Sequence, residues 1–314
     1  MFEYKNIFII IVTYNGANVI EKCIDSIFSQ NFDREKYQLL IIDNNSTDET
    51  RELIKKKYPD LNLIVNKKNY GFGKANNIGI NSTNSKYVVL LNQDSYVEKD
   101  WLKELVNSMK ENPDVACCGA KEISYDFKKS EIQRISADPK NQIWMGCGSI
   151  IFRRDALIQA GLFDEFYFMY GEDIDLSFIL KILGWRIILN EKAKWYHKGH
   201  DRKILSYSDL RLFHSWRGRI YLILKLGSFK QIIKFLLINK KKSEENAQME
   251  NKKEVTSEKE KIFIKIKFIS KLILSLFRWS FYIINSRRKI KKIIKDQSQV
   301  DSWIEYINKQ FYHK

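Results

Sequence analysis

Short apolar runs that alternate with helical patterns constrain the fold of this 314-residue chain more than any other feature. The runs at 7–15, 37–48, 61–66 and 86–94 are rich in β-branched residues, and each ends in polar residues, as buried strands do. Apolar residues with helical spacing follow between them, for example over 19–28. This alternation predicts an α/β fold with a mostly parallel sheet that is covered on both faces by helices.

Polar side chains gather where three of these predicted strands end. In parallel sheets, ligands bind outside the carboxyl ends of the strands. The pattern therefore predicts a polar ligand site at this edge, formed by three groups of residues: Tyr14 and Asn15; Asp43, Asn44 and Asn45; Asn92, Gln93 and Asp94.

Positive charge is concentrated near the C-terminus. The net charge is +16, and residues 240–314 carry 19 Lys and Arg against 9 Asp and Glu. A basic tail of this kind favours an anionic partner, either lipid headgroups or nucleic acid.

Composition also predicts the domain organisation: a main domain at 1–239, a charged linker or solvated helix at 240–261, and a basic amphipathic helical tail at 262–314. Lys and Arg interrupt the apolar residues of the tail too often for a membrane-spanning helix. Its aromatic residues and basic flank suit a helix in the membrane interface. A helical pair that packs on the domain, or on a second copy of the chain, is an equally good interpretation.

The cysteines and the N-terminal run bear on the compartment. The four cysteines form no C-x-x-C pair, and no Cys/His set has zinc spacing. The apolar run "IFIIIV" is too short for a secretory signal. We therefore expect reduced thiols and a cytoplasmic protein.

Several nucleotide and hydrolase motifs are absent from the sequence. "GFGKANNIG" at 71–79 departs from the dinucleotide fingerprint at Asn76, and no P-loop or G-x-S-x-G is present. These absences argue against a dinucleotide-dependent enzyme, a P-loop NTPase and a serine hydrolase.

Three acids open an apolar helical pattern in "FMYGEDIDLSFILKILGW" at 168–185. Glu172, Asp173 and Asp175 suit a helix cap, a metal site or a catalytic base, because acids also complement the partial positive charge of a helix N-terminus. Asp175 lies about 200° around the helix from Asp173, so both cannot face one ligand. The residue types and their spacing do not decide among a helix cap, a metal site and a catalytic base.

Several stretches match one family in order. They are "IIIVTYNGANVIEKCIDSI", "LLIIDNNSTDET", "NYGFGKANNIGI", "VVLLNQDSYV", "MGCGSIIFRRDAL", "GLFDEFYFMYGEDIDLSFILKILGWRI" and "KWYHKGH". Over about residues 6–225 the chain resembles glycosyltransferase family 2, of the GT-A fold, in its rhamnosyltransferase-like branch.

The resemblance implies a role for each matching residue. Asp94 of "NQD", which stands where the family has a D-x-D motif, would hold a divalent metal, Mn²⁺ or Mg²⁺, together with His197; His200 is the alternative. Asp173 would be the general base, with Glu172 capping or orienting its helix on the acceptor side. Trp185 would line the acceptor side, although a core tryptophan is equally plausible. The residues implied at the nucleotide sugar are Tyr14, Asn15, Asp43, Asn45, Asp48, Asn69, Gly71, Asn76, Asn77, Asn92, Gln93 and Asp94.

The resemblance further implies an inverting, metal-dependent transferase that moves a sugar from a UDP- or dTDP-sugar to a glycan or lipid-linked acceptor in surface polysaccharide biosynthesis. The branch suggests dTDP-rhamnose as the donor. The enzyme would be peripheral on the inner face of the membrane, through its basic tail. The alternative function is a catalytically silent sugar-nucleotide or membrane-surface binding subunit that recruits a partner enzyme. Nucleic acid is not an expected partner.

Overall fold

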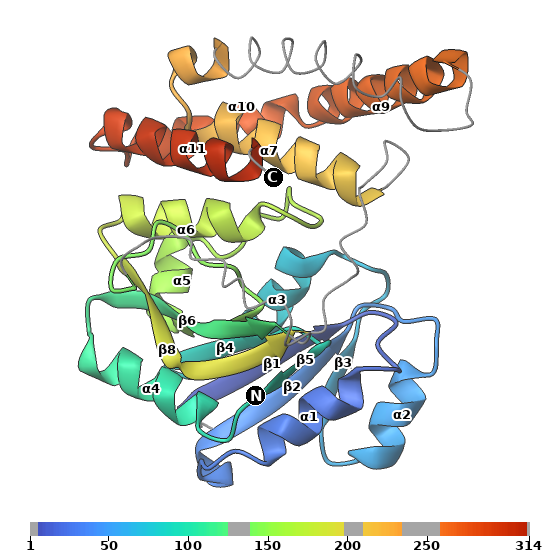
Figure 1. The fold of residues 1–314 in the computed structure, drawn as a ribbon, viewed down its shortest axis with the longest axis vertical. Coiled ribbons are helices and arrows are strands. Elements are labelled where there is room, and N and C mark those ends of the chain that lie inside the picture. Colours follow the sequence, from blue (N-terminus) through green and yellow to red (C-terminus); the bar gives the residue numbers. More distant parts are fainter. Residues whose placement is uncertain (1–5, 125–138, 198–209, 234–257, 313–314) are drawn as a thin grey trace. The chain divides into compact units, whose positions relative to one another are not determined.

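The computed structural model describes residues 6–124, 139–197, 210–233 and 258–312. The chain divides into two compact units, Met1–Arg202 and Lys203–Lys314 (Figure 1). The first unit has an α/β architecture around an eight-stranded sheet, and the described part of the second unit is helical. The predicted α/β fold is confirmed.

The sheet has the strand order β3-β2-β1-β4-β7-β6-β8-β5. Its first four strands pair in parallel, as their apolar runs predict, and they end close to where the polar residues begin. β7 runs antiparallel between β4 and β6, and β5 is antiparallel to β8 at the edge. The bounds are β1 Ile7–Thr13, β2 Tyr37–Asp43, β3 Asn62–Val65, β4 Tyr87–Leu91, β5 Ser95–Val97, β6 Val115–Ser124, β7 Ser149–Arg153 and β8 Arg186–His197.

Helices cover both faces of this sheet (Figure 1). Residues of α1, α2 and α4 belong to one buried apolar cluster, and residues of α3, α5 and α6 belong to a second cluster on the opposite face. The first unit is therefore a three-layer structure, with the strand ends left available between the helices. The bounds are α1 Ile20–Phe28, η1 Arg34–Lys36, α2 Thr50–Lys57, α3 Phe72–Asn81, α4 Trp101–Glu111, α5 Arg154–Ala160 and α6 Glu172–Ile182.

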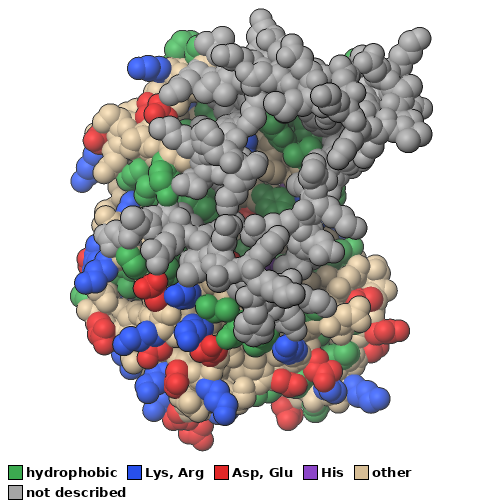
Figure 2. All heavy atoms as spheres, in the orientation of Figure 1, with side chains coloured by type: hydrophobic (Ala, Val, Ile, Leu, Met, Phe, Trp, Pro, Cys, Tyr) green, Lys and Arg blue, Asp and Glu red, His purple; other side chains and the backbone are tan. Residues whose placement is uncertain are grey.

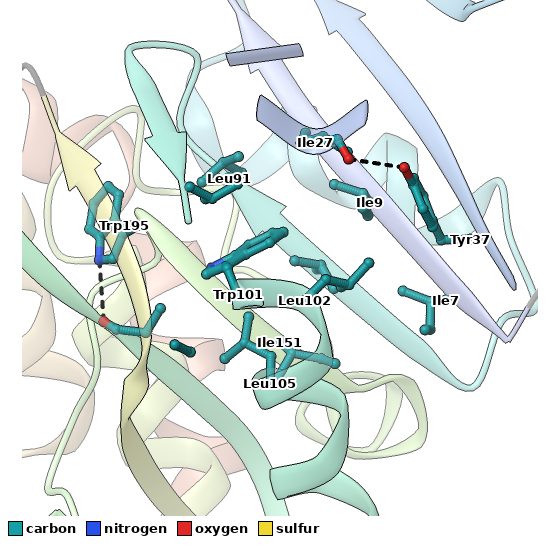
Figure 3. Close-up of a cluster of buried hydrophobic side chains, with 14 of the residues drawn as sticks. Ile7, Ile9, Ile27, Tyr37, Leu91, Trp101, Leu102, Leu105, Ile151 and Trp195 are labelled. Atoms are coloured by element: carbon teal, nitrogen blue, oxygen red, sulfur yellow. Dashed lines mark hydrogen bonds between the residues drawn. The ribbon is translucent and has the colours of Figure 1, made fainter. Parts of the chain in front are cut away.

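Large aromatic side chains fix the first of these clusters (Figure 3). Trp101 is fully buried, and its indole N–H donates to Ser149 Oγ at 2.8 Å. Tyr37 is buried too, and its hydroxyl donates to the Ile27 carbonyl at 3.0 Å. Because each buried polar tip has a partner, these rings contribute their apolar area without an unsatisfied polar group.

The second unit contains α7 Leu210–Leu226, α9 Glu258–Arg278, α10 Ser280–Lys291 and α11 Gln297–Tyr312. Phe213 of α7 packs on Phe268 and Leu272 of α9. The two compact units divide at 202/203, and the predicted domain boundary at 239 lies outside the described residues. Most of the predicted linker at 240–261 lies outside the described residues, and its last four residues belong to α9. Within the described ranges, none of the helices combines the length and apolarity needed to cross a bilayer.

Candidate active site

The loops after β1 and β2 are tied together at the carboxyl edge of the sheet. Thr13 lies opposite Asp43 in the parallel register, and the Asn44 N–H donates to the Thr13 carbonyl at 2.7 Å. Asn15 has φ of 50°, a left-handed conformation that Asn tolerates better than most residues. Its N–H donates to Ser46 Oγ at 2.9 Å, and its side-chain oxygen accepts from the Thr47 N–H at 2.8 Å. Both loops are therefore preformed, with Tyr14 exposed beside them.

Two carboxylates lie within this pair of loops. Asp43 is fully buried, and its Oδ1 accepts from the Ser46 N–H at 3.0 Å. Its Oδ2 has no hydrogen-bond partner among the described residues. Asp48 accepts from Thr50 and from the Ala17 N–H. Burial would raise the pKa of Asp48, but these hydrogen bonds outweigh it and lower that pKa.

Asn44 organises the neighbouring loop; it belongs to the predicted polar edge of the sheet but not to the residues implied at the nucleotide sugar. Its side-chain N–H groups donate to Asn69 Oδ1 at 2.8 Å and to the Gly71 carbonyl at 3.2 Å. Asn69 Oδ1 also accepts from the Gly71 N–H at 2.9 Å. The buried amide of Asn44 and the half-buried amide of Asn69 thus hold the loop that leads into α3. Asn45 follows with φ of 69°, which turns the chain away from the strand.

Two predicted donor residues on α3 have structural roles. Asn76 is buried, and its side chain donates to the Phe72 carbonyl one turn earlier at 3.0 Å. Asn77 exchanges two hydrogen bonds with the backbone of Phe163, at 2.9 and 3.1 Å. These bonds occupy both polar atoms of Asn77 and one side-chain N–H of Asn76. Their role at the nucleotide sugar stays a prediction.

Gln93 connects the ends of β1 and β4. Its Oε1 accepts from Thr13 Oγ1 and from the Tyr14 N–H, and its Nε2 donates to the Tyr14 carbonyl. A Cβ at Gly16 would lie 2.2 Å from Gln93 Oε1 and 2.6 Å from Thr13 Oγ1, so a larger residue there would displace these side chains. Gln93 therefore holds the end of β1 against the segment that follows β4. The backbone N–H of the neighbouring Asn92 donates to the Gly148 carbonyl at 2.8 Å.

Asp94 and His197 meet because of the strand register. Ser95 of β5 pairs with His197 of β8, so the preceding Asp94 faces the imidazole, and Asp94 Oδ1 lies 3.2 Å from His197 Nε2. His197 Nδ1 lies 3.4 Å from Glu122 Oε1 on β6. Burial would lower the pKa of His197, but hydrogen bonds to Asp94 and Glu122 outweigh it and raise the pKa to about 9. No motif in the sequence singled out Glu122, which reaches the site through the β6–β8 pairing. His200 lies outside the described residues.

This pair suits a divalent metal ion. Two ligands at about 2.1 Å in neighbouring octahedral positions lie about 3 Å apart, close to the observed separation. In the part of the chain that the structure describes, no cluster of three or more His, Cys, Asp or Glu side chains is arranged to hold an ion. Mg²⁺ and Mn²⁺ sites of phosphate-transferring and related enzymes commonly combine one or two protein ligands with substrate phosphates and water. The donor set therefore fits an ion that binds together with a diphosphate.

Glu172 and Asp173, called the acid pair below, lie in the first turn of α6. The helix follows a tight turn in which Tyr170 and Gly171 have φ of 65° and 104°. Glu172 is buried, and its Oε2 has no hydrogen-bond partner among the described residues. Asp173 is half-buried, and its Oδ1 accepts from the Ile174 N–H at 2.8 Å. Asp175 is buried.

Burial makes both members of this pair weak acids. It raises the pKa of Glu172 to about 8, with a further contribution from the neighbouring Asp173. Burial also raises the pKa of Asp173 to about 6. A carboxyl group whose pKa lies near neutrality can take and release a proton during a reaction.

Two contacts join the acid pair to the other parts of the site. The Phe72 N–H donates to the Phe168 carbonyl at 3.0 Å, which connects the donor-side loop to the segment before α6. A Cβ built on Gly146 lies 3.8 Å from Asp173 Oδ2, and Gly148 contacts Asn92. Two residues span at most about 7 Å, so residues 146–148 bridge the acid pair and the "NQD" segment over a short distance.

Trp185 lies away from this constellation. It follows the C-terminal end of α6, whose 11 residues separate it from Glu172 by about 16 Å along the helix. Its indole N–H donates to Gln159 Oε1 at 2.7 Å, and its ring packs on the core cluster beneath α5 and α6. These contacts suit the alternative of a core tryptophan, and the acceptor-side role stays a prediction.

Comparisons with known proteins agree with this geometry. Residues 8–169 match the family model described as Glycosyl transferase family 2. The chain is 30% identical over 104 residues to glycosyltransferase AglE of Haloferax volcanii, which is 32% of this chain and 34% of AglE. It is 32% identical over 123 residues to a dolichyl N-acetyl-alpha-D-glucosaminyl phosphate glucuronosyltransferase of Methanococcus voltae, 35% of this chain and 37% of that one. The chain thus spans about a third of the length of these relatives.

Two solved structures share the fold. Residues 1–349 of Staphylococcus aureus TarS align with a TM-score of 0.59 at 17% identity, over 98% of this chain and 93% of that one. A mannosyltransferase of Pyrobaculum calidifontis, in complex with GDP-Man and Mn²⁺, aligns with a TM-score of 0.53 at 16% identity, over 97% and 85%.

The sheet order, the polar strand ends and the acid-headed helix define a glycosyltransferase domain of the GT-A fold. Because the family model covers more than half of the chain, the protein belongs to glycosyltransferase family 2. The rhamnosyltransferase-like branch stays a prediction.

Proposed function

We propose that the protein is an inverting, metal-dependent glycosyltransferase that moves a sugar from a UDP- or dTDP-sugar to an acceptor hydroxyl. One observation carries the proposal. Asp173, a carboxyl of raised pKa, lies beside Gly146, where an added Cβ would be 3.8 Å from Asp173 Oδ2, and the carbonyl of Gly148 two residues later accepts from the N–H of Asn92 in the segment that carries Asp94. A proton acceptor and a metal-binding pair on the two sides of one short loop are what sugar transfer from a diphosphate requires.

The proton acceptor is Asp173. As the acceptor hydroxyl attacks the anomeric carbon, its proton passes to the carboxylate of Asp173, while the bond from that carbon to the diphosphate breaks. General-base assistance of this kind is worth about 10²–10⁴ in rate, roughly 3–5 kcal/mol of barrier. A single displacement inverts the anomeric centre, so no separate nucleophile is needed.

The metal site would neutralise negative charge on the leaving diphosphate. Asp94 and His197 would hold the ion, which supplies Lewis-acid neutralisation of the phosphate oxygens when bound. Glu122 accepts from His197 Nδ1–H and thereby fixes the tautomer in which Nε2 is free for the ion.

The nucleotide would bind at the loops after β1 and β2. Asp43 Oδ2 is a buried acceptor without a partner among the described residues, and a pyrimidine N3–H would satisfy it. Uracil and thymine share this edge, which leaves both UDP- and dTDP-sugars as donors. In support, a TarS structure is described in complex with UDP-GlcNAc.

For the acceptor, we propose a glycan or a lipid-linked glycan at the cytoplasmic face of the membrane. The relatives support this class through their names. The Methanococcus voltae relative is a transferase named for a dolichyl-linked sugar phosphate, and TarS is named for poly(ribitol-phosphate).

A donor screen tests the function. The protein is mixed with UDP- and dTDP-sugars, with and without Mn²⁺ or Mg²⁺, and its melting temperature is measured, since a bound donor stabilises by mass action. Turnover is then measured with lipid-linked and free glycan acceptors. The proposal fails if no donor binds. Donor binding without turnover on any acceptor would favour a silent recruiting subunit.

A further inference from the structure

Helices α9 and α10 form an almost continuous helix with two apolar faces. The Ile283 N–H donates to the Trp279 carbonyl at 2.9 Å, so the helical hydrogen bonding continues across the junction. One face packs within the second unit through Phe268, Leu272 and Ile283, which are buried. The other face is exposed and follows a spacing of three and four residues: Ile266, Ile269, Ile273, Phe277, Phe281 and Ile284, with Leu274 beside them.

The exposed face is unusually apolar for a protein surface. Phe277 and Phe281 are 79% and 77% exposed, and Ile273 is 61% exposed. Scattered single hydrophobic residues are normal on surfaces, but a contiguous row marks an interaction site. A helix that presents such a row beside basic residues is typical of a helix lying in a membrane interface.

The charge around this face has one sign. Residues 261–295 contain 11 Lys and Arg and no Asp or Glu. Lys267 and Arg278 lie on the flank of the row, at 100° per residue, and Arg288, Lys289 and Lys292 extend the basic surface over α10. Over the first unit, by contrast, Figure 2 shows Lys and Arg interspersed with Asp and Glu.

One cation of this stretch has a structural function. Arg287 donates to the carbonyls of Leu224 and Gly227 at the C-terminal end of α7, at 2.6 and 2.8 Å. It is therefore part of the packing of the second unit. The exposed cations named above are the ones available to a partner.

We propose that the exposed face of α9 and α10 docks on an anionic lipid surface, with the helix lying parallel to the membrane plane. Lipid is the occupant that satisfies both features, because its acyl region takes up the apolar row while its anionic headgroups meet the Lys and Arg residues. A second copy of this chain would bring two positive faces together. A nucleic acid would neutralise the cations but leave the aliphatic row in water. This docking goes beyond the proposed reaction and does not depend on it.

The test uses the full chain and a matched pair of variants. F277S/F281S removes two exposed aromatic rings from the docking face, and F229S removes a ring that is 75% exposed elsewhere in the second unit. Co-flotation is measured with vesicles of phosphatidylcholine mixed with phosphatidylglycerol, and with vesicles of phosphatidylcholine alone. We expect F277S/F281S to lose about tenfold or more in partition to the mixed vesicles, since each ring loses its burial in lipid. F229S should float as the wild type does.

Charge and specificity are tested in parallel. R288E/K289E should weaken flotation with the mixed vesicles, and added salt should weaken it further, because surface electrostatics are screened. K55E/K56E on α2 changes charge equally at another site and should have no effect. The proposal is overturned if the wild type does not float with mixed vesicles, or if F277S/F281S floats unchanged. It is also overturned if that variant converts a dimer to a monomer in light scattering or abolishes retention of DNA or RNA. Donor binding in the thermal-shift assay should be unaffected by F277S/F281S, which separates this outcome from failure of the proposed reaction.

Discussion

Asp48, on the loop after β2, and Asp173, at the first turn of α6, are both carboxylates of the candidate site in opposite environments. Asp48 accepts from Thr50 and Ala17, and these hydrogen bonds lower its pKa. Asp173 also accepts from backbone N–H groups, among them that of Ile174, but burial outweighs these hydrogen bonds and raises its pKa to about 6. The residue type is the same, and the surroundings decide whether the side chain stays charged or exchanges a proton near neutral pH.

The same division runs through the rest of the site. On the donor side, Asn15, Asn44 and Gln93 use their amides to hold loops in place. At the start of α6, Glu172 keeps a buried oxygen without a hydrogen-bond partner among the described residues. Asp43 Oδ2 on the donor side also lacks a hydrogen-bond partner among the described residues, so the two regions differ chiefly in the amides that hold the donor-side loops and in the raised pKa values of Glu172 and Asp173.

The largest effect is expected from D173N. Removing the proton acceptor should lower kcat by about 10²–10⁴, because general-base assistance is worth that much. Donor binding, measured by thermal shift, should stay at the wild-type level, since the donor scaffold is intact. D155N, which replaces an exposed acid in the first turn of α5, is the control and should keep full activity. Wild-type activity in D173N would remove Asp173 from the mechanism.

A smaller effect is expected from E122Q, which tests the metal side. Loss of the carboxylate that accepts from His197 Nδ1–H should weaken Mn²⁺ binding by about 10–100-fold, the usual cost of removing such a partner of a metal-binding histidine. Mn²⁺ affinity is measured directly by titration in the presence of the donor nucleotide. E191Q, on the exposed end of the same sheet, is the control. Unchanged affinity in E122Q would mean that the histidine is oriented by other groups.

The joint between the two sides can be broken at Gly71. Its φ is 82°, and a Cβ there would lie 2.2 Å from the Phe168 carbonyl oxygen. G71A should therefore destabilise the protein by roughly 3 kcal/mol, because backbone strain and a clash with a carbonyl group add together. G184A is the matched control: Gly184 has φ of 92°, but no atom lies within 4 Å of its Cβ position. Denaturant unfolding measures the loss of stability in both variants: G184A reports backbone strain alone, and G71A reports strain plus the clash. Equal losses in the two variants would show that the Phe168 contact contributes nothing.

Sequence patterns predict some of these features and miss others for identifiable reasons. The parallel strands and their polar ends follow from local periodicity, so β1–β4 were predicted close to their observed bounds. Asn76 and Asn77 lie in the predicted segment, but only the fold reveals that Phe72 and Phe163 occupy their amides. Glu122 is brought to His197 by the pairing of two strands that lie more than 60 residues apart in the chain, which no local pattern encodes. For Trp185 the sequence left an acceptor-side role and a core role open, and only the fold shows that the length of α6 lies between it and the acids.

The smallest expected effect concerns stability against pH, and it contrasts the two kinds of carboxyl directly. In the folded protein Glu172 keeps its proton up to about pH 8, whereas in the unfolded chain it loses it above its ordinary value of 4.5. Stability therefore falls as the pH rises from about 4.5 to about 8, because the unfolded state releases a proton that the folded state retains. E172Q cannot ionise, so its stability should not fall over this pH range, and its advantage over the wild type should be largest at pH 8.

Asp48 should give the opposite slope. Because the pKa of Asp48 is lowered in the folded protein, Asp48 contributes to stability at pH values above the ordinary pKa of 3.8. This contribution is lost as the pH falls through the pKa of Asp48 in the folded protein. D48N should therefore be less stable than the wild type at neutral pH, with the difference shrinking in acid, while the difference for E172Q shrinks towards pH 4.5. Denaturant unfolding across this range measures both slopes on one protein. If the two slopes had the same sign, hydrogen bonding and burial would not be what separates the donor scaffold from the acid segment.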